Sequence, residues 1–313
     1  MKVLVTGCAG FIGWNLTNYL LENTKYKVIG VDNYQGGGHN AELVKELKKK
    51  NKNFTFRREN FASTDLKGVE YIFHLGATPQ VSLSVQNPFL TNENNVTNTL
   101  AMLEHARKEG VRKIIFSSSS AVYGDIAPTP THEAVRCYPS SPYGLQKKII
   151  EDYLILYHEL YGMEFCILRY FNAYGPHQYS FNAYAGVIAS FVKGFCNITP
   201  IRIDGDGEQS RDFVYVKDIC KVNLGVVTQN VTGCLNVGSG MGTSINEVFD
   251  LISAITHHQP PTIKADKRQG DIGHSVANIT RLKEIGYQPT ELEKGLEITY
   301  QWYKKLQENG NSI

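Results

Sequence analysis

The sequence predicts an α/β fold in which a doubly wound parallel sheet carries helices on both faces, with a smaller discontinuous C-terminal lobe. Three observations predict it. A strand-like run at 2–6 is followed by a glycine turn, a helical stretch over 11–22 and a second strand-like run at 27–31, which is one βαβ unit. Further apolar runs alternate with helical stretches up to about residue 170. Beyond it, segments rich in Gly, Asn, Tyr and Pro interrupt this alternation.

The later elements of the first domain are predicted one by one from their patterns. Continuous apolar runs are typical of strands buried on both faces, and they occur at 53–57, 70–75, 112–117 and 164–170. Helical periodicity fills the intervals near 38–50, 91–109 and 143–161.

The first domain is therefore expected over 1–171, and the ordered segment 212–254 is expected to return to its sheet. The lobe is expected over 172–211, with a helix near 185–195, and over 255–313. A cleft between domains is a common place for a ligand, so the substrate is expected there.

Composition excludes several classes of protein. With 313 residues, 42% hydrophobic, 20% charged and a net charge of +2, the chain is an ordinary globular protein without the charge of a nucleic-acid binder. It has no 18-residue apolar run and no signal-peptide pattern, so no membrane association is expected. Its six cysteines are scattered without a Cys-x-x-Cys pair, which favours reduced, mostly buried thiols, a cytoplasmic location and no metal site.

Gly7, Gly10 and Gly13 form a Gly-x-x-Gly-x-x-Gly turn between the first strand and the first helix. Glycine permits a tight turn and close approach of a pyrophosphate, and the helix N-terminus offers unpaired N–H groups. The pattern predicts a dinucleotide site in a Rossmann-type domain. A turn that only packs the helix on the strand is the alternative that these residues leave open.

A carboxylate at the end of the second strand supports the dinucleotide interpretation. Asp32 stands 19 residues after Gly13, where it can accept hydrogen bonds from the adenosine ribose. Its charge repels a 2′-phosphate, and no Arg or Lys follows in 33–38, so NAD is predicted rather than NADP. The glycines at 36–38 are expected to form a loop beside the adenosine or a purely structural turn.

Tyr143 and Lys147 are spaced i, i+4 behind Pro142, which fits the first turn of a helix. A free tyrosine has a pKa of about 10, which is too high for a base at neutral pH. A neighbouring ammonium and a positive nicotinamide ring both favour the phenolate. The pair therefore predicts a general base, although a solvated helix surface gives the same spacing.

A run of serines at 117–120 follows the predicted strand 112–117. Their hydroxyls are expected at the carboxyl end of that strand, where ligands bind in open α/β sheets. The glycine turn together with Ser119, Tyr143 and Lys147 predicts a nicotinamide-dependent enzyme that acts on an alcohol or sugar carbon.

Several longer segments make the pattern specific. They are HLGA (74–77), NNVTNTL (94–100), SSSSAVYG (117–124), SPYGLQK (141–147), RYFNAYGP (169–176), GDGEQSRDFVYVKDI (205–219), NVGSG (236–240) and RQGDI (268–272). With the glycine turn and Asp32, they make the chain resemble the extended short-chain dehydrogenase/reductases, specifically the nucleotide-sugar epimerases, from Met1 to about Tyr303. The family pattern places the catalytic hydroxyl four residues before the Tyr-Gly tyrosine, at Ser119.

The resemblance implies two sets of binding residues. The NAD set is Gly7, Gly10, Phe11, Ile12, Gly13, Asp32, Asn33, Asn60, Phe61, Leu75, Gly76, Ala77, Asn95, Ser117, Tyr143, Lys147 and Phe171. The substrate set is Ser119, Tyr143, Asn172, Val187, Arg211, Arg268, Asp271 and Ser275. The two arginines suit a diphosphate because a guanidinium pairs with phosphate oxygens bidentately, although each could also form a surface salt bridge.

The chain departs from its relatives at informative positions. The related 4,6-dehydratases carry two acids directly after the catalytic hydroxyl, where this chain has Ser120 and Ala121, and the acid usual in the decarboxylases is also missing. The aspartate that contacts adenine in the family is replaced by Asn60, which leaves the adenine contact open.

The resemblance implies that Ser275 sets the sugar specificity. It lies seven residues after Arg268, at a position where tyrosine restricts the family's pocket to plain hexoses and a small residue admits an N-acetyl group. Serine supports UDP-GlcNAc and UDP-GalNAc without excluding UDP-Glc and UDP-Gal. His177 and His274 are expected either to line the same pocket or to pack at the surface.

The implied activity is NAD-dependent C4 epimerisation of a UDP-sugar through a 4-keto intermediate. The alternatives are a UDP-uronate 4-epimerase, a 2-epimerase, a 4-reductase, or a catalytically silent nucleotide-sensing protein. The resemblance also implies a homodimer built from helices 91–109 and 143–161. Leu100, Leu103, Ile150 and Leu154 are candidates for its interface, although each could pack inside its own subunit.

Overall fold

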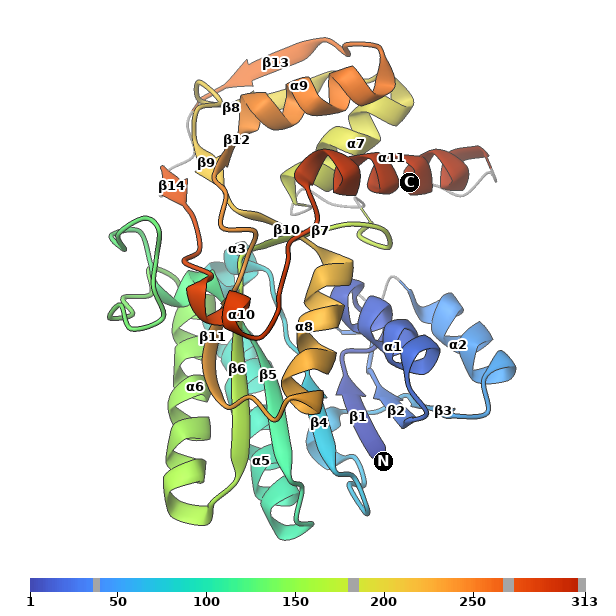
Figure 1. The fold of residues 1–313 in the computed structure, drawn as a ribbon, viewed down its shortest axis with the longest axis vertical. Helices are drawn as coiled ribbons and strands as arrows, with labels where there is room; N and C mark the ends of the chain where they lie inside the picture. The colour runs from blue at the N-terminus through green and yellow to red at the C-terminus, as the bar shows by residue number, and fades with distance from the viewer. Residues whose placement is uncertain (36–39, 180–185, 267–272, 309–313) are drawn as a thin grey trace. The chain divides into compact units, whose positions relative to one another are not determined.

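The central sheet of the computed structural model has seven strands in the order β11-β6-β5-β4-β1-β2-β3 (Figure 1). The strands are β1 (Lys2–Thr6), β2 (Lys27–Val31), β3 (Phe54–Arg57), β4 (Tyr71–His74), β5 (Lys113–Ser119), β6 (Glu164–Tyr170) and β11 (Gly233–Val237). From β3 across to β6, neighbouring strands are paired in parallel. Strand order reverses between β1 and β4, which is the switch point where doubly wound sheets bind ligands. The predicted α/β fold is confirmed.

The structure describes residues 1–35, 40–179, 186–266 and 273–308. They fall into two compact units. The first contains 1–127, 135–170 and 219–235, and the second contains 128–134, 171–218 and 236–313.

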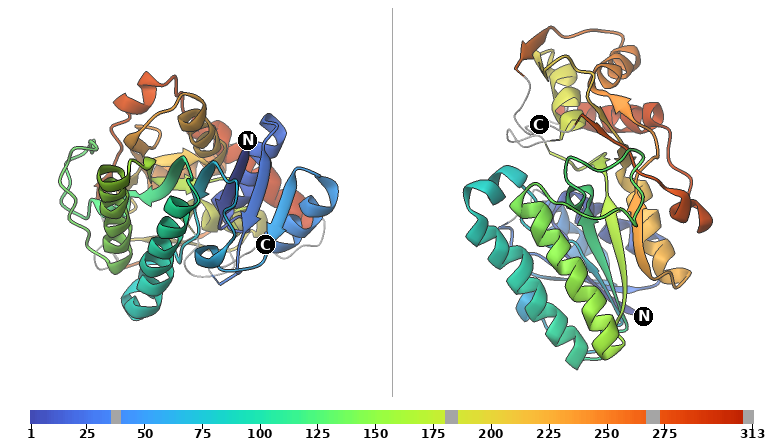
Figure 2. Two further views of the ribbon diagram at one scale, coloured as in Figure 1. Left: turned by 90° about the horizontal axis from the view of Figure 1, so that it is seen from below. Right: turned by 90° about the vertical axis from the view of Figure 1, so that its left-hand side faces the viewer.

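The helices of the first unit cover both faces of its sheet. In the right-hand view of Figure 2, α5 (Asn98–Lys108) and α6 (Pro142–Tyr161) lie side by side on one face, and α8 (Val216–Thr228) lies on the other. The remaining helical segments of this unit are α1 (Phe11–Asn23), α2 (Ala41–Lys50), η1 (Phe61–Ser63), α3 (Val81–Gln86), α4 (Pro88–Asn92), the π-helical turn η2 (Glu93–Thr97) and η3 (Ser120–Val122).

The ends of α6 follow from local sequence. The Ser141 hydroxyl accepts a hydrogen bond from the Gly144 N–H at 3.1 Å, and Pro142 occupies the first helical position. Gly162 ends the helix in the left-handed region, with φ +68°. The start of this helix, which carries Tyr143, is therefore fixed by its own cap.

Buried side chains between the sheet and the α5–α6 face form the core of the first unit. Leu103, Ile150 and Leu154 are at most 2% exposed within this core, and Leu100 is half-buried against it. Of the two placements that the sequence left open for Leu103, Ile150 and Leu154, the structure shows packing inside their own subunit, so these side chains are not available to a dimer interface.

In its described residues, the second unit contains short strands and four helices. The strands pair as β7 (Asn172–Tyr174) with β10 (Phe213–Tyr215), β8 (Ile201–Asp204) with β13 (Thr262–Ala265), and β9 (Ser210–Arg211) with both β12 (Thr243–Ser244) and β14 (His274–Ser275). The helices are α7 (Val187–Asn197), α9 (Ile245–Thr256), α10 (Thr280–Glu284) and α11 (Leu292–Glu308). Phe249 of α9 lies against Phe191 and Phe195 of α7, so aromatic packing joins these helices.

Two expected boundaries differ from the structure. The segment 212–254 does not return to the sheet as a whole: 219–235 belongs to the first unit, whereas 236–254 belongs to the second. The predicted helix 91–109 is interrupted by the π-helical turn. None of the six cysteines forms a disulfide; three are buried and three are half-buried.

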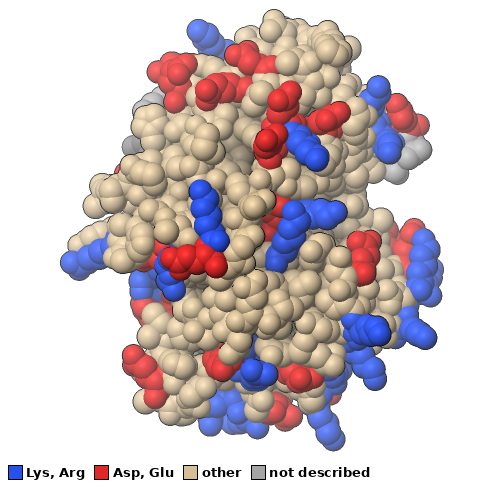
Figure 3. All heavy atoms as spheres, in the orientation of Figure 1, with Lys and Arg blue, Asp and Glu red and all other residues tan. Residues whose placement is uncertain are grey.

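The surface and the helices give two further observations. On the face drawn in Figure 3, basic and acidic side chains both occur across the surface, in keeping with the small net charge. No helix in the described part of the chain combines the length and apolarity needed to cross a bilayer.

Candidate functional site

The glycine turn is shaped by two close backbone approaches. Gly7 has φ +69°, a conformation that other residues rarely adopt. A Cβ on Gly13 would lie 2.0 Å from the Gly7 carbonyl oxygen, so only glycine lets α1 approach β1 this closely. Gly10 caps α1 without a side chain and the first turn carries no acid, which leaves its N–H groups open to an anion. The predicted cradle therefore fits a dinucleotide pyrophosphate.

Asp32 follows β2 and holds the turn from the side. Its carboxylate accepts hydrogen bonds from the N–H groups of Ala9 (2.9 Å) and Tyr34 (2.8 Å). Burial raises the pKa of Asp32, and these two hydrogen bonds act against that rise. The predicted residue Asn33 lies between Asp32 and Tyr34 in the sequence, and the glycines at 36–38 lie outside the described residues.

Sequence reasoning missed a cation at this end of the sheet, close to Tyr34. The Arg58 guanidinium lies 5.0 Å from the ring centroid of Tyr34, which is only two residues after Asp32. Arg58 directly follows β3, the strand paired in parallel with β2. The sequence signal for it is a basic residue directly after the third predicted strand, because parallel neighbours end at the same edge of a sheet.

The loop after β4 is tied to β1 at the switch point. The Thr6 hydroxyl oxygen accepts hydrogen bonds from the N–H groups of Leu75 (3.0 Å) and Gly76 (2.9 Å). It also bonds to Nδ1 of His74 at 2.8 Å, and Nε2 of His74 bonds to Thr99 at 2.9 Å. Burial lowers the pKa of His74 to about 3, so the imidazole is neutral.

The predicted residues on both sides of this loop come together in the structure. A Cβ on Gly7 would lie 2.9 Å from the Gly76 nitrogen, and a Cβ on Gly76 would lie 2.8 Å from the Phe61 ring. Phe61 also packs edge-on against His74, at 4.9 Å between ring centroids. Asn60 caps this short helix by accepting from the Ala62 N–H at 2.9 Å. The structure thus gathers these predicted cofactor residues at one edge of the sheet.

Asn95 lies in the π-helical turn and is 1% exposed. Its amide oxygen accepts from the Thr78 N–H at 2.7 Å, and its amide nitrogen donates to the Thr78 carbonyl (3.1 Å) and to Gln146 of α6 (2.8 Å). Such turns are frequent at functional sites. Here the turn presents an amide that joins the loop after Ala77 to helix α6. The predicted contact of Asn95 with NAD stays a prediction.

Ser119 and Tyr143 meet at the end of β5. Ser119 is the last residue of the strand, and its hydroxyl oxygen accepts from the Ala121 N–H at 3.2 Å. Tyr143 is the second residue of α6, and its N–H donates to the Ser84 hydroxyl at 3.1 Å. Desolvation raises the pKa of Tyr143 to about 12, and its hydrogen bond with Ser119 opposes this rise. The two predicted hydroxyls are therefore in contact.

Lys147 lies one turn further along α6 and is buried. Its ammonium donates to the Ser117 carbonyl at 2.7 Å and lies 5.8 Å from the Tyr143 ring centroid. Burial lowers the pKa of Lys147 to about 7, and the charge of Glu151 acts against this fall. Ser117 itself bonds to the Tyr170 hydroxyl at 3.1 Å. The end of β5 and helix α6 thus hold the Lys147 ammonium beside Tyr143.

In the second unit, Arg211 and Ser275 are register partners of the parallel β9–β14 pair. Their neighbours Ser210 and His274 are also paired, and these two side chains share a hydrogen bond of 2.8 Å. Successive side chains in a strand point to opposite faces, so Arg211 and Ser275 share the other face. His274 is exposed and engaged with Ser210.

Asp212 was not predicted, although it follows Arg211 in a family motif. It is fully buried, and its carboxylate accepts from the N–H groups of Ser239 (2.6 Å), Gly240 (2.9 Å) and Ala277 (3.0 Å). Its carbonyl accepts from the backbone and side chain of Asn172. Asp212 therefore joins the segments that carry the predicted substrate residues.

Five other residues were predicted for the site. Val187 is the first residue of α7, and Phe171 is buried with its N–H on the Val237 carbonyl. Arg268 and Asp271 lie outside the described residues. The His177 ring packs on Trp302 at 4.9 Å, and burial lowers its pKa to about 4. The ligand contacts of all these residues stay predictions.

Comparison with known proteins decides the family. A model of the NAD-dependent epimerase/dehydratase family matches residues 3–238. This chain belongs to that family. A relative from Methanocaldococcus jannaschii, described as a putative UDP-glucose 4-epimerase, is 39% identical over 96% of this chain and 98% of its own length.

Two solved structures of family members are also closely similar. A UDP-N-acetylglucosamine 4-epimerase from Methanobrevibacter ruminantium, with UDP-N-acetylmuramic acid, has a TM-score of 0.90 at 37% identity over 97% of this chain and 98% of its own. A UDP-glucuronic acid 4-epimerase from Bacillus cereus, with UDP-glucuronic acid and NAD, has a TM-score of 0.89 at 31% identity over 98% and 100% of the two chains. The expected family and its NAD cofactor are confirmed.

The nucleotide preference of this family member can be tested at Asp32 and Arg58. We expect the purified protein to carry NAD(H) that added NADP does not displace. Asp32→Asn removes the charge that repels a 2′-phosphate and should raise NADP affinity at least about tenfold, or ~1.4 kcal/mol, in a competition assay. Adding Arg58→Ala should abolish that gain, because Arg58 is the nearby cation. Tighter binding of NADP than NAD by the unmodified protein would contradict the assignment.

Proposed function

We propose that this protein interconverts the C4 epimers of a UDP-sugar. The observation that carries the proposal is the contact between Ser119 and Tyr143 at the end of β5, with the Lys147 ammonium behind it. The relatives described above are named as 4-epimerases of UDP-glucose, UDP-N-acetylglucosamine or UDP-glucuronic acid, the first of them as putative. The site and the family support the same reaction.

In the proposed mechanism, Tyr143 takes the proton of the C4 hydroxyl and returns it after the sugar has turned. Ser119 shares a hydrogen bond with Tyr143 and can hold the same hydroxyl, which places the proton between them. NAD, when bound, supplies the acceptor and donor of the C4 hydride. The sugar passes through a 4-keto form, whose two faces must both become reachable.

Lys147 makes the phenolate available. The pKa of about 12 for Tyr143 disfavours the base form near neutrality, and a positive charge on Lys147 opposes that penalty. Its hydrogen bond to the Ser117 carbonyl fixes the ammonium at the strand end. Catalysis is therefore expected to need a deprotonated Tyr143 and a protonated Lys147 together.

The substrate test compares three sugars. The protein is incubated separately with UDP-Glc, UDP-GlcNAc and UDP-GlcA, and the products are separated as C4 and C2 epimers. We expect the two neutral sugars to be converted at C4. C4 conversion of UDP-GlcA alone would favour the uronate epimerase. A C2 product would favour the 2-epimerase, and stoichiometric consumption of NADH would favour the reductase. No conversion of any sugar would contradict the proposal and favour a silent nucleotide-sensing protein.

We further propose that the protein is a homodimer built on α6. Leu145, Ile149, Leu156 and Leu160 recur at helical spacing, which defines an apolar stripe of α6. Leu145, Leu156 and Leu160 are between 43% and 60% exposed, unlike the inward Ile150 and Leu154. α5 and α6 are neighbours on this face (Figure 2), so a second copy can complete a four-helix bundle.

The dimer proposal predicts the effect of charge on this stripe. Leu156→Glu together with Leu160→Glu should convert the protein to a monomer of 35.0 kDa in sedimentation at micromolar concentration, because like charges would meet across the two-fold axis. Ile263→Glu, on the equally exposed β13, is the matched control and should leave the dimer intact. A monomeric unmodified protein would refute the proposal.

The cysteines support a reducing compartment, which we infer to be the cytoplasm. None of the six forms a disulfide, as is usual for proteins of reducing compartments.

A further inference from the structure

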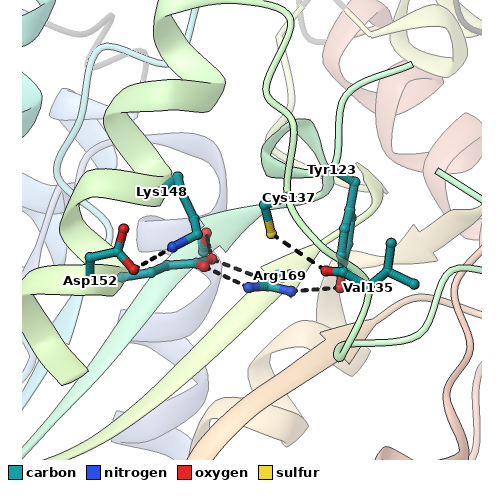
Figure 4. A network of polar contacts seen from close by, with 8 residues as sticks. Tyr123, Val135, Cys137, Lys148, Asp152 and Arg169 are labelled. Carbon is teal, nitrogen blue, oxygen red and sulfur yellow. Dashed lines mark hydrogen bonds and ion pairs between the residues drawn. The ribbon is translucent and has the colours of Figure 1, made fainter. Parts of the chain in front are cut away.

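Glu151 and Arg169 form a buried ion pair behind the catalytic face of the first unit. Glu151 on α6 is 1% exposed and Arg169 on β6 is 6% exposed. The guanidinium is bidentate, with Nε donating to Oε1 at 3.0 Å and the second nitrogen donating to Oε2 at 2.7 Å. Figure 4 shows Arg169 between α6 and Tyr123. Neither residue was singled out from the sequence as part of the site.

The pair reaches the segment that carries Ser119. The Ser118 hydroxyl donates to Glu151 Oε1 at 2.5 Å, and Ser118 directly precedes Ser119 in β5. On the other side, Arg169 donates to the Tyr123 hydroxyl at 2.9 Å, and its guanidinium lies 4.8 Å from the Tyr123 ring centroid. Tyr123 follows the short helix η3 that Ser119 caps. The charge pair therefore holds the chain before and after Ser119.

The pair also reaches Lys147. Glu151 lies four residues after Lys147 on α6, so the two side chains share one face of the helix. Lys147 bonds to the Ser117 carbonyl and Glu151 to the Ser118 hydroxyl, so successive residues of β5 meet successive turns of α6. One carboxylate thus faces the catalytic ammonium and the catalytic strand end together.

We propose that Glu151 is a positioning residue for the epimerase reaction, with Arg169 as its partner: its charge keeps Lys147 protonated, and its hydrogen bond to Ser118 fixes the strand end that presents Ser119. The inference rests on the proposed function, because it assigns Glu151 a part in that same site. Neither residue touches the sugar in this role; both act through Lys147 and Ser118.

The other titratable groups around Lys147 do not replace Glu151. His74 faces it from β4, but burial lowers the pKa of His74 to about 3, so it stays neutral. Tyr143 on α6 and Tyr170 on β6 are phenols whose pKa burial raises, so both are neutral near pH 7 without a cofactor. The negative charge that raises the pKa of Lys147 comes from Glu151.

Stability alone explains the pair poorly. Removing two charges from water is expensive, and buried pairs of this kind are often replaced by apolar residues without loss of stability. A charge pair in this position is better accounted for by what it does to the ammonium one turn away.

The test removes the charge while keeping the shape. Glu151→Gln should lower the pKa of Lys147 by about 1 unit, the lower end of the effect of one neighbouring charge. Because activity needs the ammonium, the alkaline limb of the kcat profile should move to lower pH by the same amount. The pKa of Lys147 is also read without any sugar, from the NMR titration of ¹³Cε-lysine in the NAD-bound protein, with the Lys147 signal assigned by its absence in Lys147→Met.

A second variant covers failure of the first to fold, since Glu151→Gln leaves Arg169 buried without its partner. The double variant Glu151→Gln/Arg169→Gln removes both charges. It should also lower the pKa of Lys147, but by less than Glu151→Gln alone. Glu159→Gln, an exposed carboxylate on the same helix, is the matched control and should leave both readouts unchanged.

The two readouts separate the inference from the proposed function. A Lys147 titration that is unaltered in either folded Glu151 variant would overturn the inference, whatever the sugar. Loss of rate without any shift of the alkaline limb would also overturn it, because that is the signature of a purely structural pair. If the unmodified protein converts no UDP-sugar but the pKa of Lys147 still falls in the Glu151 variant, only the proposed function is overturned.

Discussion

Tyr143→Phe should lower turnover by at least ~10²-fold, the lower end of what a general acid–base group contributes. The substitution removes one oxygen atom, and with it the proposed proton acceptor for the C4 hydroxyl and the hydrogen bond to Ser119. The ring position is set by the helix cap at Ser141 and the Tyr143 N–H bond to Ser84, neither of which needs the phenol. The fold and the bound NAD should therefore be retained.

The measurement is the rate of C4 epimer formation at saturating UDP-sugar, together with NAD content and the thermal unfolding curve. Tyr153→Phe, ten residues along the same helix and half-buried, is the matched control and should leave turnover unchanged. Near-normal epimerisation by Tyr143→Phe would show that Tyr143 is not the general base of the reaction.

The features that were predictable from the sequence are local or lie at element ends. Gly7, Gly13 and Asp32 belong to one βαβ unit, so their spacing alone places them together. Tyr143 and Lys147 share a helix face by simple periodicity. Ser119 required one further rule, that ligands gather at the carboxyl ends of parallel strands. For these residues the spacing along the sequence is enough to predict which side chains lie close together.

The missed residues depend on pairings that no local pattern encodes. Thr6 and His74 are 68 positions apart, and Ser118 and Glu151 are 33 apart. Arg58 could be placed near Asp32's strand end only once it was known that β3 lies beside β2. Without the strand order, each of these polar side chains is indistinguishable from a surface residue.

The helix face that is free for a dimer could not be chosen from the sequence for a different reason. α6 is apolar on more than one side, with Ile150 and Leu154 facing the core and Leu156 and Leu160 facing solvent. Periodicity identifies such stripes but does not tell which one meets the sheet. Only the packing of α6 against the core shows which apolar stripe is buried and which is exposed.

Ser275→Tyr should depress conversion of UDP-GlcNAc more than that of UDP-Glc. The phenol is expected to fill the space that an N-acetyl group needs, and overpacking a rigid pocket costs ~1–3 kcal/mol. At ~1.4 kcal/mol per factor of ten, that corresponds to roughly 5- to 150-fold in the ratio of kcat/KM values for the two sugars.

A one-residue shift in the family correspondence would put His274 or Val276 at this position, and the strand geometry opposes both. The His274 side chain bonds to Ser210 on one face of the β9–β14 pair, and Val276 is 9% exposed, with a methyl group 2.8 Å from where a Cβ on Gly242 would lie. Alternation leaves Ser275 on the face of Arg211, the predicted diphosphate ligand. Of the three, Ser275 is the residue whose face matches a sugar that follows a diphosphate.

Ser210→Tyr is the matched control for this specificity test, because it adds the same side chain to the same strand pair on the opposite face. It should leave the ratio of kcat/KM values for UDP-GlcNAc and UDP-Glc near that of the unmodified protein. An unchanged ratio in Ser275→Tyr would show that Ser275 does not face C2 of the sugar. The small side chain at position 275 would then give no support to N-acetylated substrates, and the choice among sugars would pass to residues on other segments of the second unit.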